Sequence, residues 1–195
     1  MVLTYKADSI AQRRRRGFSP KNQSLFAVTN RLLRSREDIL QKKHYTPVNF
    51  ANLEFIHVAG VTILAGLGLC LFFIISMPSR ACRTPQTDAV EYAMLLLLIL
   101  MLTPLSFTYT YIWFLYPLMV SCNILLSNLS ARIRRVMLIS FIGCVLLLGF
   151  SLPVSCFDIF KAMGNTFWVC VFLFITFGWI LIQIRSGKEI FREER

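Results

Sequence analysis

Charged residues are unevenly distributed along this chain. They are dense in residues 1–54, whereas residues 55–184 consist of long uncharged runs separated by short charged clusters. A helix that crosses the hydrocarbon core of a bilayer needs roughly 20 mainly apolar residues. The pattern therefore predicts a polar first part followed by a membrane domain over residues 55–184.

Charged residues delimit five predicted spans. No charge lies between Glu54 and Arg80, and 40 uncharged residues separate Glu91 from Arg132, which is enough for two crossings joined by a turn near Pro104. Two further runs of 22 and 23 uncharged residues follow, between Arg135 and Asp158 and between Lys161 and Arg185. The expected spans are 56–77, 89–104, 108–128, 136–156 and 165–184. The predicted fold class is all-α, a polytopic helical membrane protein with about five transmembrane helices.

Composition supports a membrane protein. The chain has 195 residues, of which 56% are hydrophobic and 13% aromatic, and its mean hydropathy of +0.61 is too high for an ordinary soluble domain. A soluble enzyme is therefore not expected.

The polar first part divides into two predicted segments. Residues 1–21 form a basic flexible arm with four arginines at positions 13–16, and residues 22–54 form an extracytoplasmic segment. Within that segment, Leu25, Val28, Leu32 and Leu33 recur at helical spacing, which predicts a short amphipathic helix over residues 24–36. Such a helix lies on a membrane surface, and the alternative is a helix that packs on a soluble neighbour.

The short loops predict the orientation, because Lys and Arg collect on the cytoplasmic side of a membrane. Nine basic residues lie on one side and only Lys161 lies on the other. The nine are Arg80, Arg83, Arg132, Arg134, Arg135, Arg185, Lys188, Arg192 and Arg195. The expected location is a bacterial-type cell inner membrane, with residues 185–195 as a charged cytoplasmic tail.

Five crossings then place residues 1–54 outside, although this segment carries eleven basic residues that are difficult to translocate at the start of a protein. We therefore expect that further membrane helices precede this chain in a longer protein.

The formal charge of +11 also raises the possibility of nucleic acid as a partner. The arginines at 13–16 are followed by no base-reading motif and no interleaved aromatic residues, so no nucleic-acid partner is expected. The six cysteines include no CxxC pair and are expected to be free thiols, with Cys82 and Cys156 open to other roles. No metal site and no cofactor are predicted.

Two local patterns resemble glycosyltransferase family 87, formerly domain of unknown function 2029. The first is Asn22-Gln23-Ser24-Leu25 with Arg31 downstream, which is similar to the family's extracytoplasmic NQSL segment. The second begins at Glu91-Tyr92-Ala93, reaches Thr103-Pro104-Leu105-Ser106-Phe107 and continues through Tyr111, Trp113 and Pro117, and it resembles the family's SP(L/I)SW turn and aromatic span. Phe107 stands where the family commonly has Trp, and Tyr109 and Thr110 stand where it has His.

The resemblance implies the C-terminal part of a GT-C-like bundle. Family members are polyprenyl-phosphate-dependent mannosyl or arabinosyl transferases. The implied partners are a polyprenyl-phosphate sugar donor, a glycan or glycolipid acceptor, membrane lipid and an N-terminal half chain. The implied substrate-binding residues are Asn22, Gln23, Arg31, Ser106 and Tyr109. The catalytic residue stays unknown, because no position here corresponds to the family's acidic loop.

Other residues with suitable chemistry have alternative interpretations. Asp158 is a candidate base or an ordinary loop carboxylate, and Arg34 and Lys21 are phosphate ligands or headgroup-facing cations. His57 is a proton shuttle or an interfacial histidine, and Trp113 belongs to an aromatic belt or a sugar platform. A different class of function also stays open, namely a non-enzymatic membrane scaffold or a transporter subunit. Transport usually requires ionisable residues at the midplane, which these spans lack.

Overall fold

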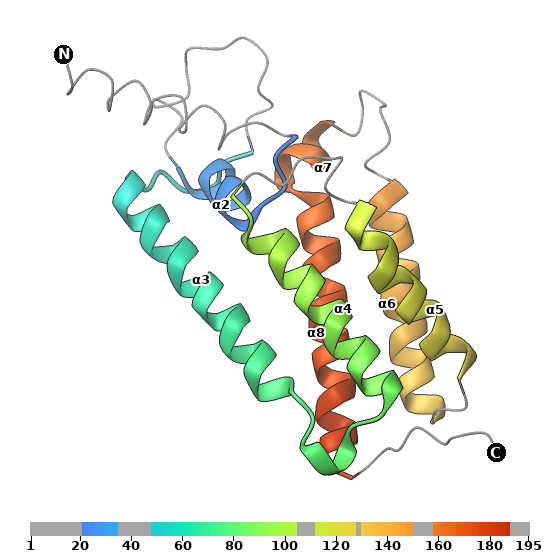
Figure 1. The fold of residues 1–195 in the computed structure, drawn as a ribbon. Helices are drawn as coiled ribbons and strands as arrows, with labels where there is room; N and C mark the ends of the chain where they lie inside the picture. Colours follow the sequence, from blue (N-terminus) through green and yellow to red (C-terminus); the bar gives the residue numbers. More distant parts are fainter. Residues whose placement is uncertain (1–20, 35–47, 105–111, 128–129, 150–157, 188–195) are drawn as a thin grey trace.

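The structure is a computed structural model, and it describes residues 21–34, 48–104, 112–127, 130–149 and 158–187. All named elements in these ranges are helical, and five of the helices form an up-and-down bundle (Figure 1). They are α3 (Phe55–Ser76), α4 (Pro85–Leu102), α5 (Leu115–Leu126), α6 (Ala131–Gly149) and α8 (Asn165–Arg185). The predicted all-α fold is confirmed.

Three of the described helices are long and apolar enough to cross a membrane, namely α3, α4 and α8. They correspond to the predicted spans 56–77, 89–104 and 165–184. The other two predicted spans correspond to the α-helices Leu115–Leu126 and Ala131–Gly149. Residues 112–114 form a 3₁₀ turn before the first of these, and residues 108–111, 128 and 150–156 lie outside the described residues. α5 is short, and α6 carries three arginines within its first five residues.

Outward-facing apolar side chains cover the bundle. Leu64 of α3 is 70% exposed and Ile139 of α6 is 65% exposed, and many other large hydrophobic residues are similarly open. Apolar surface on this scale is unfavourable in water and suits the hydrocarbon core of a membrane. The charged residues of the five helices lie near helix ends, which leaves an uncharged middle band.

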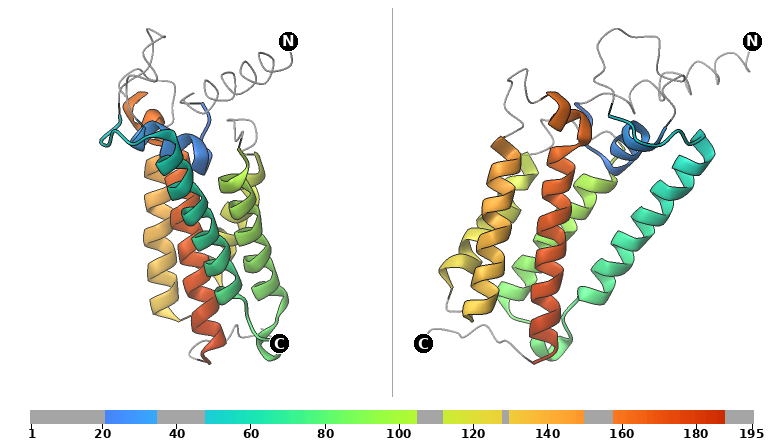
Figure 2. Two further views of the ribbon diagram at one scale, coloured as in Figure 1. Left: turned by 90° about the vertical axis from the view of Figure 1, so that its left-hand side faces the viewer. Right: turned by 180° about the vertical axis from the view of Figure 1, so that it is seen from behind.

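α8 lies at the centre of the bundle, against α3, α4 and α6 (Figures 1 and 2). Its side chains Phe174 and Phe177 are fully buried in the core. Gly178 allows α3 to come close, because a Cβ there would overlap the ring of Phe72. Ser140 of α6 and Thr176 of α8 join their helices by a hydrogen bond of 2.8 Å between the hydroxyl oxygens.

α4 and α5 run antiparallel, so the 40 uncharged residues form two helices rather than one, as predicted. α4 ends at Leu102, shortly before Pro104, whose ring nitrogen has no hydrogen to donate. The turn was predicted near Pro104, which the structure describes as a turn residue, and residues 105–111 lie outside the described residues.

Two helix starts lie earlier than predicted. α4 begins at Pro85, because Thr84 and Thr87 form a capping box and proline is well tolerated at a first helical position. α6 begins at Ala131 rather than residue 136, so its arginines belong to the helix and not to the preceding loop. The sequence prediction took the last charge as the boundary, but a long arginine side chain can lie in the first turn and extend towards water.

The predicted amphipathic helix exists as α2 (Leu25–Leu33), which is shorter than residues 24–36. It ends because residues 50–53 pair with its last turn: the backbone N–H groups of Phe50 and Leu53 donate to the carbonyls of Leu32 and Leu33. α2 packs on the bundle itself, between the first turns of α3 and the short helix α7 (Asp158–Met163) (Figures 1 and 2). The apolar face of α2 is therefore covered by the helices of the bundle and not by a soluble neighbour, and its predicted position at the membrane surface stays a prediction.

Candidate functional site

The predicted site residues Asn22, Gln23 and Arg31 lie together at the end of the bundle where α3 begins and α4 ends. All three are buried, together with Ser24. Their side chains bond to main-chain carbonyls of segments distant in the sequence. We call these four residues, with the carbonyls of Pro104, Lys161 and Ala162, the polar junction.

Asn22 and Ser24 connect the start of α2 to the end of α4. The amide Nδ2 of Asn22 donates to the carbonyl of Pro104 at 2.8 Å, and the Ser24 hydroxyl donates to the same carbonyl at 3.2 Å. Ser24 is also the N-cap of α2, because its Oγ accepts from the backbone N–H of Ala27 at 3.2 Å. The Asn22 Oδ1 accepts from the Ser24 N–H and so fixes the local turn.

Gln23 and Arg31 connect α2 to α7. The amide Nε2 of Gln23 donates to the carbonyl of Lys161 at 2.9 Å, and Nε of Arg31 donates to the carbonyl of Ala162 at 2.7 Å. These carbonyls lie in the last turn of α7, where helix carbonyls lack intrahelical partners and favour a nearby cation. Arg31 also donates from Nη1 to the carbonyl of Asn22 at 2.7 Å.

Gly164, between α7 and α8, allows α2 to pack tightly against the bundle. Its φ of 84° lies in the left-handed region that glycine adopts without strain. A Cβ at this position would lie 2.5 Å from Cγ2 of Val28 in α2. The turn therefore requires glycine both for its backbone conformation and for space.

α2 is also attached to α3. The hydroxyl groups of Thr29 and Thr62 are 2.7 Å apart, and the Arg34 guanidinium lies 5.2 Å from the ring centroid of Phe55. Arg34 is 3% exposed, so it is a packed residue of the α2–α3 contact and not a freely solvated cation.

The remaining predicted residues are not part of the junction in the described structure. Ser106 and Tyr109 lie outside the described residues, as does Tyr111. His57 is exposed near the start of α3. Asp158 begins α7, but its side chain lies outside the description. Trp113 and Trp168, near the junction end of the bundle, are both exposed, as an interfacial aromatic belt requires.

Several members of the junction were not predicted from the sequence. Ser24 before an apolar helical pattern is a typical N-cap signal and could have been assigned. Gly164, which adjoins the junction without belonging to it, is a weaker sequence signal for a turn. The carbonyls of Pro104, Lys161 and Ala162 belong to the main chain, so residue types give no indication of them.

The described cysteines Cys70, Cys82, Cys122, Cys144 and Cys170 are free thiols, as predicted, and Cys156 lies outside the description. Within the described ranges, no group of three His, Cys, Asp or Glu side chains is placed to hold a metal ion.

The geometry suits positioning and recognition more than proton transfer. The junction contains amide, hydroxyl and guanidinium donors, and its four side chains include no carboxylate. Comparison with known proteins adds no relative: no family model, no curated protein and no solved structure matches this chain.

Proposed function

We propose that this chain is the C-terminal, membrane-embedded part of a glycosyltransferase that moves a sugar from a polyprenyl-phosphate donor to a glycolipid or polysaccharide acceptor. In this proposal it lies in a cell inner membrane with its C-terminus in the cytoplasm, and the polar junction is on the opposite side. The catalytic carboxylate comes from an N-terminal part.

One observation carries the proposal. The two sequence patterns that resemble the transferase family are 82 positions apart at Asn22 and Pro104, and a hydrogen bond of 2.8 Å joins these residues. Ser24, from the first pattern, bonds to the same carbonyl. Two patterns that contribute to one site must come together in space, and these two do.

The junction also indicates a division of roles. Three side chains, those of Asn22, Gln23 and Arg31, donate hydrogen bonds to main-chain carbonyls of this chain. In this proposal they therefore hold the end of α4 and the last turn of α7 in position. Ser106 and Tyr109 follow directly after Pro104 in the sequence and contact the substrate. Substrate binding by all five residues stays a prediction.

Photo-crosslinking tests the proposal without requiring catalysis. The full chain in phosphatidylcholine nanodiscs is exposed to a polyprenyl-phosphate hexose that carries a photoreactive group on the lipid. We expect labelling of peptides that contain residues 21–34 or 103–114, and unlabelled polyprenyl-phosphate hexose should compete. Labelling that no excess of this competitor reduces would contradict the proposal.

The same hydrogen bonds support a second candidate, a non-enzymatic membrane scaffold. A junction whose donors bond to main-chain carbonyls also serves simply to hold helices together. The crosslinking experiment separates the two candidates, because a scaffold has no saturable site for the sugar lipid. A transporter subunit is less well supported, since the middle band of the described helices carries no charge.

A further inference from the structure

The end of the bundle opposite the polar junction is rich in arginine. It contains Arg80 and Arg83 between α3 and α4, three arginines at the start of α6, and Arg185 at the end of α8 (Figure 1). The acidic residues of the described helices at this end are Asp88 and Glu91, so the six cations are in excess. We call this region the arginine-rich end.

Some of these cations already have partners inside the protein. Arg83 forms an ion pair with Glu91 at 3.4 Å, and Arg185 donates to the carbonyl of Ile75 at 3.0 Å. The three arginines of α6 differ: Arg132, Arg134 and Arg135 are exposed, and within the described ranges no carboxylate pairs with any of them.

The position of these arginines is electrostatically unfavourable without an anion. They lie in the first five residues of α6, where the unpaired N–H groups of the helix already give a partial positive charge. The first turn contains no acidic residue that would offset these charges. An anion bound here would offset them.

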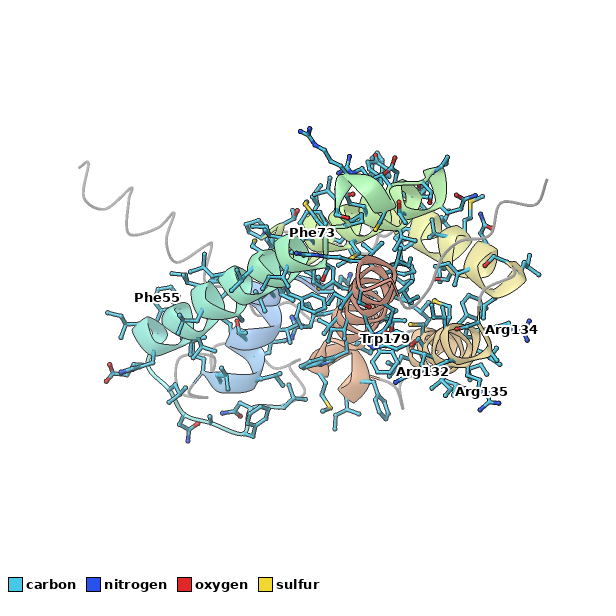
Figure 3. The ribbon with its side chains drawn as sticks, turned by 90° about the horizontal axis from the view of Figure 1, so that it is seen from below. Phe55, Phe73, Arg132, Arg134, Arg135 and Trp179 are labelled. Carbon is cyan, nitrogen blue, oxygen red and sulfur yellow. The ribbon has the colours of Figure 1, made fainter. Side chains whose placement is uncertain are left out.

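Apolar surface adjoins the cations directly. Leu138, Ile139 and Ile142 of α6 are exposed within the next turns of the same helix. The guanidinium carbon of Arg132 is 5.8 Å from the ring centroid of Trp179 in α8, so an indole lies beside this cation (Figure 3). A cationic group above an apolar strip fits a phosphate headgroup followed by an acyl chain.

The C-terminal tail does not cancel this charge. Residues 188–195 contain three basic and three acidic side chains, so their formal contribution is zero.

We infer that Arg132, Arg134 and Arg135 form a binding site for the headgroup of an anionic phospholipid, with its acyl chain along the outer face of α6. This inference does not depend on the transferase proposal.

Tryptophan quenching tests the site. Trp113→Phe with Trp168→Phe leaves Trp179, beside Arg132, as the reporter, and both replaced residues lie at the opposite end of the bundle. The full chain is placed in phosphatidylcholine membranes that contain brominated phosphatidylglycerol or, for comparison, brominated phosphatidylcholine. At low salt we expect phosphatidylglycerol to be preferred by roughly fivefold or more, because one arginine near a headgroup contributes about fivefold.

Variants and salt identify the cause. Arg134→Gln with Arg135→Gln should reduce the preference by about fivefold or more, and because both side chains are exposed the fold should be retained. Lys21→Gln removes a cation at the opposite end and should leave the preference unchanged. High salt should weaken the preference of the unaltered protein.

Three results would overturn the site. They are equal quenching by the two lipids, an unchanged preference in the double variant, and a preference that millimolar inorganic phosphate abolishes at constant ionic strength. The last result would indicate a site for free phosphate and not for lipid.

Discussion

Arg31 is a cation that the protein keeps only 5% exposed, and its neighbours explain why this is tolerated. The guanidinium donates to the carbonyls of Ala162 and Asn22, both at 2.7 Å. Buried polar groups are costly unless they are hydrogen-bonded, and here Nε and Nη1 of the guanidinium both have carbonyl acceptors. Arg31 thus joins α2 both to α7 and to the segment that precedes α2.

Replacement of Arg31 by alanine should destabilise the protein by about 1.5 to 3 kcal/mol, the usual cost of losing hydrogen bonds to a charged group. Arg31→Lys should recover only part of this loss, because an ammonium group cannot reproduce the planar fork. Thermal unfolding in a neutral detergent measures both effects. Arg134→Ala is the matched control, since Arg134 is exposed and should change stability by less than about 0.5 kcal/mol. Equal melting temperatures for Arg31→Ala and Arg134→Ala would contradict a structural role of Arg31.

Gly164 should tolerate no side chain. Gly164→Ala places a β-carbon against Val28 and also forces alanine into the left-handed region, which costs about 1 to 2 kcal/mol by itself. Gly187 separates the two effects, because its φ is also positive (68°) but a Cβ there would meet nothing within 4 Å. We expect Gly164→Ala to lower the unfolding temperature more than Gly187→Ala does. When Val28→Ala is added to Gly164→Ala, part of the difference in unfolding temperature between Gly164→Ala and Gly187→Ala should be recovered. If none is recovered, overlap with Val28 is not the cause of that difference.

At the residue scale, sequence reasoning identified one side of the junction only. Asn22, Gln23 and Arg31 were selected through the resemblance, and they do lie together. Their partners could not be selected, because a carbonyl is present at every position and only the fold determines which one is nearby. The exposed state of His57 and the burial of Arg34 likewise depend on packing between α2 and α3.

At the scale of elements, runs without charge predicted the helices and capping residues set their ends. The antiparallel pair α4 and α5 followed from the length of one uncharged run. The short helix α7 was not predicted, because six residues provide too little periodicity to distinguish a helix from a loop. α2 was predicted as a helix, but its contacts with α3, which follows it closely in the sequence, and with α7, which is far away in the sequence, were not predicted.

The contact between α3 and α8 depends on Gly178. A Cβ there would overlap Phe72 and lie 2.9 Å from the Ser76 hydroxyl, so Gly178→Ala should push the two helices apart. We expect a loss of about 1 to 3 kcal/mol, which is typical of overpacking. Gly68→Ala is the control within α3, because a Cβ there meets nothing within 4 Å and alanine favours the helix by about 0.5 to 1 kcal/mol. Unfolding in detergent that ranks the two variants in the opposite order would contradict this contact.

At the scale of the whole molecule, the two ends of the bundle differ in character. One end has exposed arginines, and the other has the polar junction with its buried cation. The excess of basic residues in the short loops predicted this asymmetry, since such loops resist translocation. The sequence could not predict that the segment before the first span folds back onto the bundle.

Cysteine labelling tests the orientation. In a variant whose six native cysteines are replaced by serine, Asn52→Cys and Ser130→Cys place single thiols at opposite ends of the bundle. A membrane-impermeant maleimide added to intact cells should label Asn52→Cys and leave Ser130→Cys unlabelled until the membrane is permeabilised. Labelling of Ser130→Cys alone would reverse the orientation, and labelling of both would exclude an odd number of crossings between them.

The hydrogen bond between Gln23 and Lys161 spans 138 positions and determines the order in which the molecule can be completed. A ribosome makes α2 before α7, so the carbonyls of Lys161 and Ala162 and the turn at Gly164 do not exist until α3, α4, α5 and α6 have been synthesised. The helices of a membrane protein can each insert as they emerge, because their backbone bonds are internal. α2 has no such independence, and its buried arginine must wait in water or at the headgroups. The closing of residues 21–34 onto α7 is therefore a step that follows the insertion of the intervening helices.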